Sequence, residues 1–213
     1  MGFLTDESPI TEQALAQEYS CSQSTVREAL MRLQHNGLVD RRGYEGTFVT
    51  SITEEEAVVM VRLRVDLECA CMERVVARIT GNDFDELQQM DSEYREHRGR
   101  RDAYACSEVD RTFHRTLFNI SGMPMLEPIL SRTLLQLHRY MLSRHEGNIT
   151  FPRSPHATHA EILDEIRTGE VDAAKAVIKK HIAAATTFLV PDVGAIVFGE
   201  ETTRTIAANL ASA

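Results

Sequence analysis

The sequence has 213 residues, of which 43% are hydrophobic and 26% charged, and a net charge of −9. These values are typical of a soluble protein with one or two domains and a sizeable core. The negative charge argues against indiscriminate binding to nucleic acids, which depends on neutralising phosphates. No apolar run is long enough to span a bilayer and no signal-peptide pattern opens the chain, so we expect a cytoplasmic protein with no membrane partner.

Residues 22–37 have the pattern of an amphipathic helix with marked ends. Its apolar residues recur at the spacing i, i+3, i+4, i+7, namely Val26, Ala29, Leu30 and Leu33. This spacing predicts that one face packs on a core, while basic side chains are left on the outer face. Ser22 or Ser24 can cap the beginning of the helix, and Gly37 can supply the left-handed residue that ends it.

The segments around this helix give it the context of a DNA-binding motif. Residues 11–19 form a shorter helical pattern upstream, separated from it by a brief connection. Downstream, short β-type runs at 38–39 and 47–49 flank a turn-rich hairpin that carries Arg41 and Arg42. Helix, turn, helix and wing predict a winged helix-turn-helix, in which the second helix enters the major groove and the hairpin touches the neighbouring backbone.

This segment contains the motifs Ser24-Thr-Val-Arg-Glu-Ala-Leu, Arg32-Leu, Asn36-Gly-Leu-Val and Gly46-Thr-Phe-Val. Together they resemble the winged-helix domain of GntR-type bacterial transcription regulators. The resemblance implies a DNA-binding domain at residues 1–50 that binds double-stranded operator DNA. The positions expected at the DNA are Ser22, Gln23, Ser24, Thr25, Arg27, Arg32, Arg41, Arg42 and Gly46. Domains of this family open with a helix of their own, and we expect that helix to be missing from the sequence.

Beyond residue 50 the sequence changes to long helical patterns. The segment Thr53-Glu-Glu-Glu56 is a capping box that predicts a helix from residue 54 to about 81, apolar on more than one face and largely buried. Asn82 or Asp83 is expected to cap the next helix. Further helical patterns cover about 109–118, 126–141, 156–168 and 171–190. Nothing between 54 and 190 alternates like a strand, so the sequence predicts a mainly α protein, with a winged helix followed by an all-α bundle of about six helices.

Four side chains of this bundle are candidate metal ligands. Asp110 and His114 are spaced i, i+4 on one helical face, and His159 and His181 come from two other helices. Imidazole and carboxylate groups suit zinc, nickel, manganese or iron, and four protein ligands leave room for water or a small ligand. A surface salt bridge is an alternative interpretation of the Asp110/His114 pair, and His156 is a competing ligand.

A second resemblance covers residues 54–190 and bears on this site. The motifs Arg64-Val-Asp-Leu-Glu68, Asp110-Arg-Thr-Phe-His114 and His159-Ala-Glu-Ile-Leu, with Lys180-His181, resemble the effector-binding domain of the FCD branch of the FadR subfamily. The resemblance implies one divalent metal per chain, with zinc preferred, and a homodimer. It also implies a small carboxylate effector that completes the coordination of the metal. The implied ligands are Asp110, His114, His159 and His181.

The leading hypothesis is a DNA-binding transcription regulator, not an enzyme, controlled by a small organic acid bound at the metal. Arg64 is a candidate clamp for the effector carboxylate, although a structural salt bridge with Glu68, one turn along the helix, is favoured over that role. A metal-dependent hydrolase or lyase is the competing class, but no HExxH-type motif supports it. A regulator with a purely structural metal, or none, is the third alternative. The tail at 191–213 receives no functional prediction.

Overall fold

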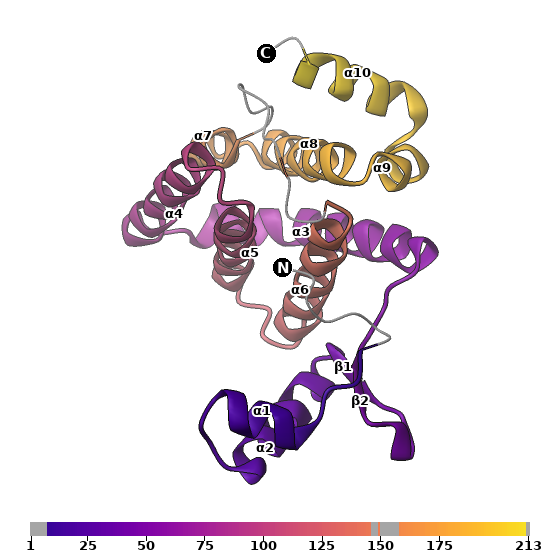
Figure 1. The fold of residues 1–213 in the computed structure, drawn as a ribbon. Helices are drawn as coiled ribbons and strands as arrows, with labels where there is room; N and C mark the ends of the chain where they lie inside the picture. The colour runs from indigo at the N-terminus through magenta and orange to yellow at the C-terminus, as the bar shows by residue number, and fades with distance from the viewer. Residues whose placement is uncertain (1–7, 146–148, 150–157, 212–213) are drawn as a thin grey trace. The chain divides into compact units, whose positions relative to one another are not determined.

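The structure is a computed structural model that describes residues 8–145, 149 and 158–211 (Figure 1). It divides the chain into two compact units, residues 1–53 and 54–213. Within the described residues, helices dominate and a single two-stranded antiparallel sheet follows the first two helices. The predicted fold class, a winged helix-turn-helix before an all-helical bundle, is confirmed. No helix of the described residues combines the length and apolarity that a membrane crossing needs.

The N-terminal unit contains two helices and a hairpin. Its elements in order are α1 (Glu12–Glu18), α2 (Gln23–His35), β1 (Val39–Arg41), a 3-10 turn η1 (Gly43–Glu45) and β2 (Thr47–Val49). The strands pair with Val39 opposite Val49 and Arg41 opposite Thr47, and the backbone N–H of Ile10 donates to the carbonyl of Thr47 at 2.7 Å. This hydrogen bond links the segment just before α1 to the hairpin.

Helix α2 has the predicted ends but buries only half of its predicted stripe. Ser22 caps the helix by accepting a hydrogen bond from the backbone N–H of Thr25 at 3.1 Å, and Gly37 has a φ of +70°. A small core holds Val26 and Leu30 together with Ile10, Val39 and their neighbours. Ala29 and Leu33 were expected in the core and are exposed. That expectation was wrong because α1 and the hairpin cover only one side of the stripe.

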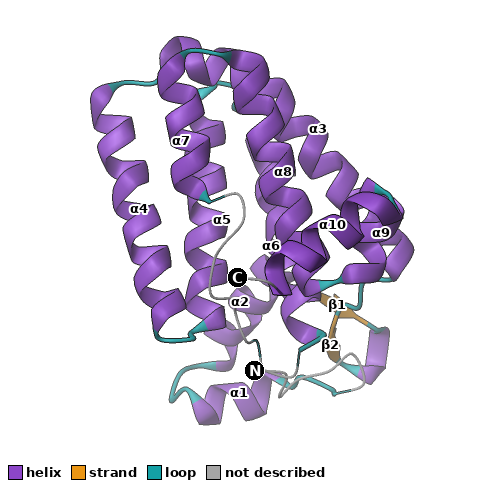
Figure 2. Ribbon diagram, turned by 90° about the horizontal axis from the view of Figure 1, so that it is seen from above, coloured by secondary structure: helices purple, strands orange, loops and turns teal. Residues whose placement is uncertain are grey.

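The second unit is a bundle of helices (Figure 2). Its elements are α3 (Glu54–Arg78), α4 (Gly81–Gly99), α5 (Ala103–Ile120), α6 (Glu127–Ser143), α7 (His159–Thr168) and α8 (Val171–Leu189), followed by α9 (Pro191–Phe198) and α10 (Glu200–Ala211). Helix α3 contacts α5, α6, α7, α8 and α9, so it is the common packing partner of the bundle. Its buried face includes Val61, Met72 and Val75.

Two local expectations for the bundle were wrong. Helix α4 is capped by Thr80, not by Asn82 or Asp83, because Thr80 and Asp83 form a reciprocal capping box that starts the helix at Gly81. Helix α3 is buried along one face only, since Val59 is 62% and Leu63 37% exposed. The predicted competing ligand His156 lies outside the described residues.

The tail forms two helices that pack on the bundle. Helix α9 contacts α3 and α8, and α10 lies over α8 and α9 (Figure 1). The contact of α9 with α8 depends on Gly194, because a Cβ atom there would lie 2.9 Å from Oγ1 and 3.0 Å from Cα of Thr187. Such distances require the two helices to move apart.

A pair of glycine substitutions tests this contact. We expect Gly194→Ala to lower the free energy of unfolding by about 1–3 kcal/mol, the usual cost of overpacking. Gly81→Ala is the control, because a Cβ at Gly81 meets nothing within 4 Å, and it should leave stability unchanged or raise it by up to about 1 kcal/mol. Urea unfolding of both variants measures the difference. Equal stabilities would contradict the close approach of α9 and α8.

Candidate metal centre and DNA-binding helix

The four candidate ligands converge at one point of the bundle. Asp110 and His114 come from α5, His159 is the first residue of α7, and His181 lies on α8. One ligand atom from each lies within 4.8 Å of all the others. Nε2 of His159 is 3.1 Å and Nε2 of His181 is 3.3 Å from Oδ1 of Asp110. Tetrahedral zinc, with bonds of about 2.0–2.2 Å, separates its ligand atoms by roughly 3.3–3.6 Å, so the distances from His159 and His181 to Asp110 are close to those that such an ion requires.

Local sequence explains how the side chains reach this point. One helical turn separates Asp110 from His114, so both face the interior from the same side of α5. His159 follows the capping residue Thr158, and its ring stacks on Phe113 with 4.1 Å between ring centroids. Spacing along α5 therefore places Asp110 and His114, whereas a helix end and ring packing place His159.

A buried carboxylate holds His114 from the side opposite the cluster. Nδ1 of His114 donates to Oε2 of Glu68 at 2.6 Å, and Nε of Arg64 donates to Oε1 of Glu68 at 2.7 Å. Burial alone would raise the pKa of Glu68, but His114 and Arg64 outweigh it and hold this pKa at about 2. A histidine that donates one nitrogen to a carboxylate presents the other to a metal. His114 thus has the surroundings of a metal ligand.

Burial and neighbouring charges set the protonation of the cluster. Burial lowers the pKa of His159 to about 4, so this ring is neutral and can donate a lone pair at neutral pH. Burial would raise the pKa of Asp110, but His114 and hydrogen bonds from the other histidines hold it well below its usual range. The cluster therefore combines an ionised carboxylate with a neutral imidazole.

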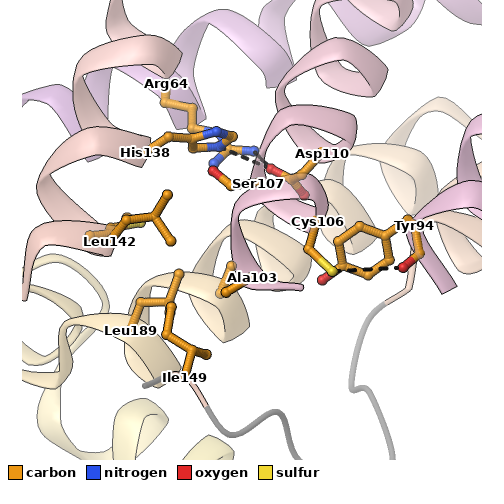
Figure 3. A pocket seen from close by; sticks show the side chains of 12 residues that line it. Arg64, Tyr94, Ala103, Cys106, Ser107, Asp110, His138, Leu142, Ile149 and Leu189 are labelled. Carbon is orange, nitrogen blue, oxygen red and sulfur yellow. Dashed lines mark hydrogen bonds and ion pairs between the residues drawn. The ribbon is translucent and has the colours of Figure 1, made fainter. Parts of the chain in front are cut away.

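A small cavity lies beside Asp110 (Figure 3). Its wall includes Arg64, Ser107, Asp110 and His138, and it continues along apolar side chains. Nε2 of His138 lies 3.1 Å from Oδ2 of Asp110, and Nη2 of Arg64 lies 3.8 Å from the same oxygen. Two roles were predicted for Arg64, a salt bridge with Glu68 and a clamp for an effector carboxylate. The geometry allows both, since Nε binds Glu68 while Nη2 has no hydrogen-bond partner.

Two residues of the site were missed by the sequence analysis. His138 was not considered, although it lies on the buried face of α6 among Leu134, Leu137 and Met141. A histidine within an apolar stripe is an indication that could have identified it. Glu68 was considered only as a partner of Arg64, and its contact with His114 brings together residues 46 positions apart in the sequence.

Most of the predicted DNA-contacting residues lie near the beginning of α2 or on the hairpin, and Arg32 lies in the last turn of α2. Residues 22–25 are exposed, and Arg27 has 56% of its side chain exposed. Nε and Nη2 of Arg27 donate to the carboxylate of Glu12, and Nη2 of Arg41 donates to the same group at 2.7 Å. Glu12 therefore links α1, α2 and β1 and fixes two arginines that sequence reasoning placed at the DNA.

The remaining predicted contacts, Arg32, Arg42 and Gly46, have other neighbours. Arg32 pairs with Glu28 on the outer face of α2 and has 78% of its side chain exposed. The guanidinium of Arg42 stacks over the ring of Phe48 at 4.6 Å from its centroid, and Gly46 follows η1 with a φ of +113°. The arginines thus lie on α2 and the hairpin within one compact unit.

Family models match both parts of the chain. The model described as "Bacterial regulatory proteins, gntR family" matches residues 2–49, and the FCD domain model matches residues 59–184. The chain belongs to the GntR family of regulators with an FCD domain. The resemblance inferred from the sequence motifs is thereby confirmed, and the protein is a DNA-binding transcription regulator of this family.

Relatives and solved structures agree with this assignment. The chain is 24% identical over 177 residues to the HTH-type transcriptional repressor RspR of Escherichia coli, covering 82% of the chain and 76% of the relative. It is 23% identical over 181 residues to a probable D-xylose utilization operon repressor of Paenarthrobacter nicotinovorans, covering 83% and 77%. The fold is similar to Escherichia coli McbR/YncC, with a TM-score of 0.75, 18% identity and coverage of 90% and 91%. A putative GntR regulator from Rhodococcus sp. RHA1 follows, with a TM-score of 0.67, 21% identity and coverage of 93% and 91%.

Metal content tests the cluster directly. We expect about one divalent ion per purified chain and loss of most of it in His159→Ala or His181→Ala, because each removes one of four converging ligands. Glu68→Gln should weaken metal affinity roughly 10–100-fold by releasing His114. His97→Ala, outside the cluster, is the matched control and should keep its metal. Elemental analysis that finds no metal, together with melting unchanged by a chelator, would contradict the site.

Proposed function

We propose that this GntR regulator, a member of the FadR subfamily, is controlled by a small carboxylate effector bound at a divalent-metal site in its helical domain. In this proposal residues 1–50 bind the operator and residues 54–190 bind the metal and the effector and form a homodimer. The observation that carries the proposal is the convergence of Asp110, His114, His159 and His181 beside a cavity that contains Arg64. A buried cation and an open metal position favour a carboxylate over a neutral ligand.

Zinc is the preferred ion in this proposal. Three imidazoles and one carboxylate are donors that zinc accepts in a closed or five-coordinate site, and nickel, manganese or iron are alternatives with the same ligand types. When bound, the ion would supply a Lewis-acidic position for one carboxylate oxygen. Arg64 would orient the acid through Nη2, which has no hydrogen-bond partner, while Glu68 holds both Arg64 and His114 in place.

A homodimer is supported by the exposed apolar side of α3. Val59 and Leu63 are one helical turn apart and face solvent in the single chain. Apolar side chains at such spacing are typical of surfaces buried between copies of a chain. Two winged helices held by a symmetric dimer would bind the two halves of a pseudo-palindromic operator.

The DNA-binding part of the proposal assigns contacts to the residues that the resemblance implied. Ser22, Gln23, Ser24 and Thr25 form the exposed beginning of α2, where a recognition helix contacts base edges. Arg27, Arg32, Arg41, Arg42 and Gly46 are assigned to the phosphate backbone. Phosphate contacts position the protein and make its affinity dependent on salt.

Two arginine substitutions test the recognition helix. Arg27→Ala and Arg32→Ala should each weaken operator binding, and each should lower the slope of log affinity against log salt by about one. Arg204→Ala is a matched control, because Arg204 also has 78% of its side chain exposed and pairs with a glutamate four residues away. Titration of operator DNA at two salt concentrations gives both quantities. Unchanged affinity in both α2 variants would remove this helix from the interface.

A thermal-shift screen tests the effector class. Small organic acids should raise the melting temperature of the metal-loaded protein, because a ligand that binds only the folded state stabilises it. The same acids should have little effect after chelation. D-xylose should serve as the neutral comparison ligand. Hits confined to neutral sugars, or acid hits that are indifferent to the metal, would contradict the proposal.

A further inference from the structure

The predicted DNA-binding surface of the N-terminal unit contains an acidic side chain, Glu12, between two of its arginines. Nε of Arg27 donates to Oε1 of Glu12 at 3.1 Å, and Nη2 of Arg27 donates to Oε2 at 2.7 Å. Nη2 of Arg41 donates to Oε1 at 2.7 Å. A carboxylate beside two arginines cancels part of the charge that attracts DNA. Charge alone therefore does not explain why an acidic residue lies here.

Hydrogen bonds and burial fix the backbone next to Glu12. Glu12 is the first residue of α1, and Thr11 caps this helix by accepting a hydrogen bond from the backbone N–H of Ala14 at 3.2 Å. Ile10 is 8% exposed, and its N–H donates to the carbonyl of Thr47 at 2.7 Å. The carboxylate of Glu12 is therefore an acceptor whose position is set by the small core and by the hairpin.

The two arginines are more exposed than the carboxylate that holds them. The exposed fraction of the side chain is 56% for Arg27, 46% for Arg41 and 21% for Glu12. The hydrogen bonds to Glu12 use Nε and Nη2 of Arg27 and Nη2 of Arg41, and they do not involve Nη1 of either arginine. A guanidinium carries five N–H donors in a planar fork. Each arginine can therefore bind Glu12 and a phosphate at the same time.

Fixing the two guanidiniums has opposite effects on two kinds of DNA complex. An exposed arginine that nothing holds loses rotamer freedom on binding, which weakens a complex by roughly 2–12-fold for each side chain. Arg27 and Arg41 come from α2 and β1, and their shared carboxylate sets the distance between them. This benefit applies where the phosphate contacts have a fixed geometry. Non-specific binding depends instead on net charge, which Glu12 lowers.

We propose that Glu12 is a positioning residue for operator binding, which holds Arg27 and Arg41 for the phosphates of a correctly docked site and lowers their attraction to other DNA. Phosphate contacts fix the register of a protein on the duplex. A pair of pre-positioned arginines therefore favours the complex in which α2 reaches the base edges. This inference rests on the proposed contacts of Arg27 and Arg41 with the phosphate backbone, and it assigns Glu12 no contact with DNA.

A charge-matched pair of variants of the full chain tests the inference. The probes are a duplex selected from a random-sequence pool by the unmodified protein and the same duplex with its base order shuffled. Glu12→Gln should weaken binding to the selected duplex about three- to tenfold. Its binding to the shuffled duplex should stay unchanged or become tighter. The control Glu18→Gln removes the same charge from the exposed end of α1 and should affect both duplexes equally. Fluorescence anisotropy measures the dissociation constants.

Other roles for Glu12 give different results, and each would overturn the inference. If Glu12 only opposes DNA through its charge, Glu12→Gln will bind both duplexes more tightly by the same factor. If Glu12 only links the elements of the unit, Glu12→Gln will weaken both duplexes by the same factor and lower the melting temperature. Binding unchanged on both duplexes would also overturn the inference.

Arg27→Lys separates positioning from charge. Lysine keeps the positive charge but lacks the planar fork that makes two parallel bonds to one carboxylate. We expect Arg27→Lys to lose affinity for the selected duplex as Glu12→Gln does, and to keep its affinity for the shuffled duplex. The double variant should lose less than the product of the two single losses, because both changes remove the same pair. Fully multiplicative losses would contradict the action of Glu12 through Arg27.

Alanine variants distinguish failure of this inference from failure of the proposed DNA contacts. If Arg27→Ala and Arg41→Ala weaken binding to the selected duplex but Glu12→Gln does not lower the preference for it, the inference fails and the proposed contacts stand. If neither alanine variant weakens binding to the selected duplex, the contacts and the inference both fail.

Discussion

The carboxylate of Asp110 is the group on which the helical unit depends. An ionised carboxylate removed from water is tolerated only when cations or hydrogen-bond donors surround it. Here His159 and His181 approach one oxygen, while His138 and Arg64 approach the other. These partners come from α7, α8, α6 and α3, and Asp110 itself comes from α5. Five helices therefore contribute side chains around this one carboxylate. The packing of the bundle depends on the interactions that the carboxylate makes.

Helix α3 connects this site to the rest of the chain. It begins at Glu54, directly after the N-terminal unit, and presents Arg64 and Glu68 to the cluster from its buried face. Arg64 lies ten residues into the helix, about 15 Å along its axis. A ligand that moves Arg64 acts on a rigid element whose beginning is covalently joined to the winged helix. An effector controls DNA binding only if it binds two states of such an element with different affinities.

The sequence predicted the fold class well because its helices are long and their ends are marked by caps, glycine and proline. The four candidate metal ligands lie close together, because i, i+4 spacing places Asp110 and His114 on one face and the family motifs indicated the other two, and their role as ligands stays a prediction. His138 and the contact of Glu68 with His114 could not be predicted from spacing, since they depend on how α3, α5 and α6 pack. The exposed Ala29 and Leu33 show the same limit, because periodicity indicates which face is apolar but not what covers it.

X-ray absorption spectroscopy of the zinc-loaded protein tests the central claim most directly. The account predicts zinc bound by three imidazole nitrogens and one carboxylate oxygen at about 2.0–2.2 Å, with no sulfur ligand. Addition of a small carboxylate that binds the protein should change the oxygen shell and leave the three imidazoles in place. A spectrum with fewer than three imidazoles, or with thiolate ligands from the cysteines, would contradict the assignment of Asp110, His114, His159 and His181 as the metal centre.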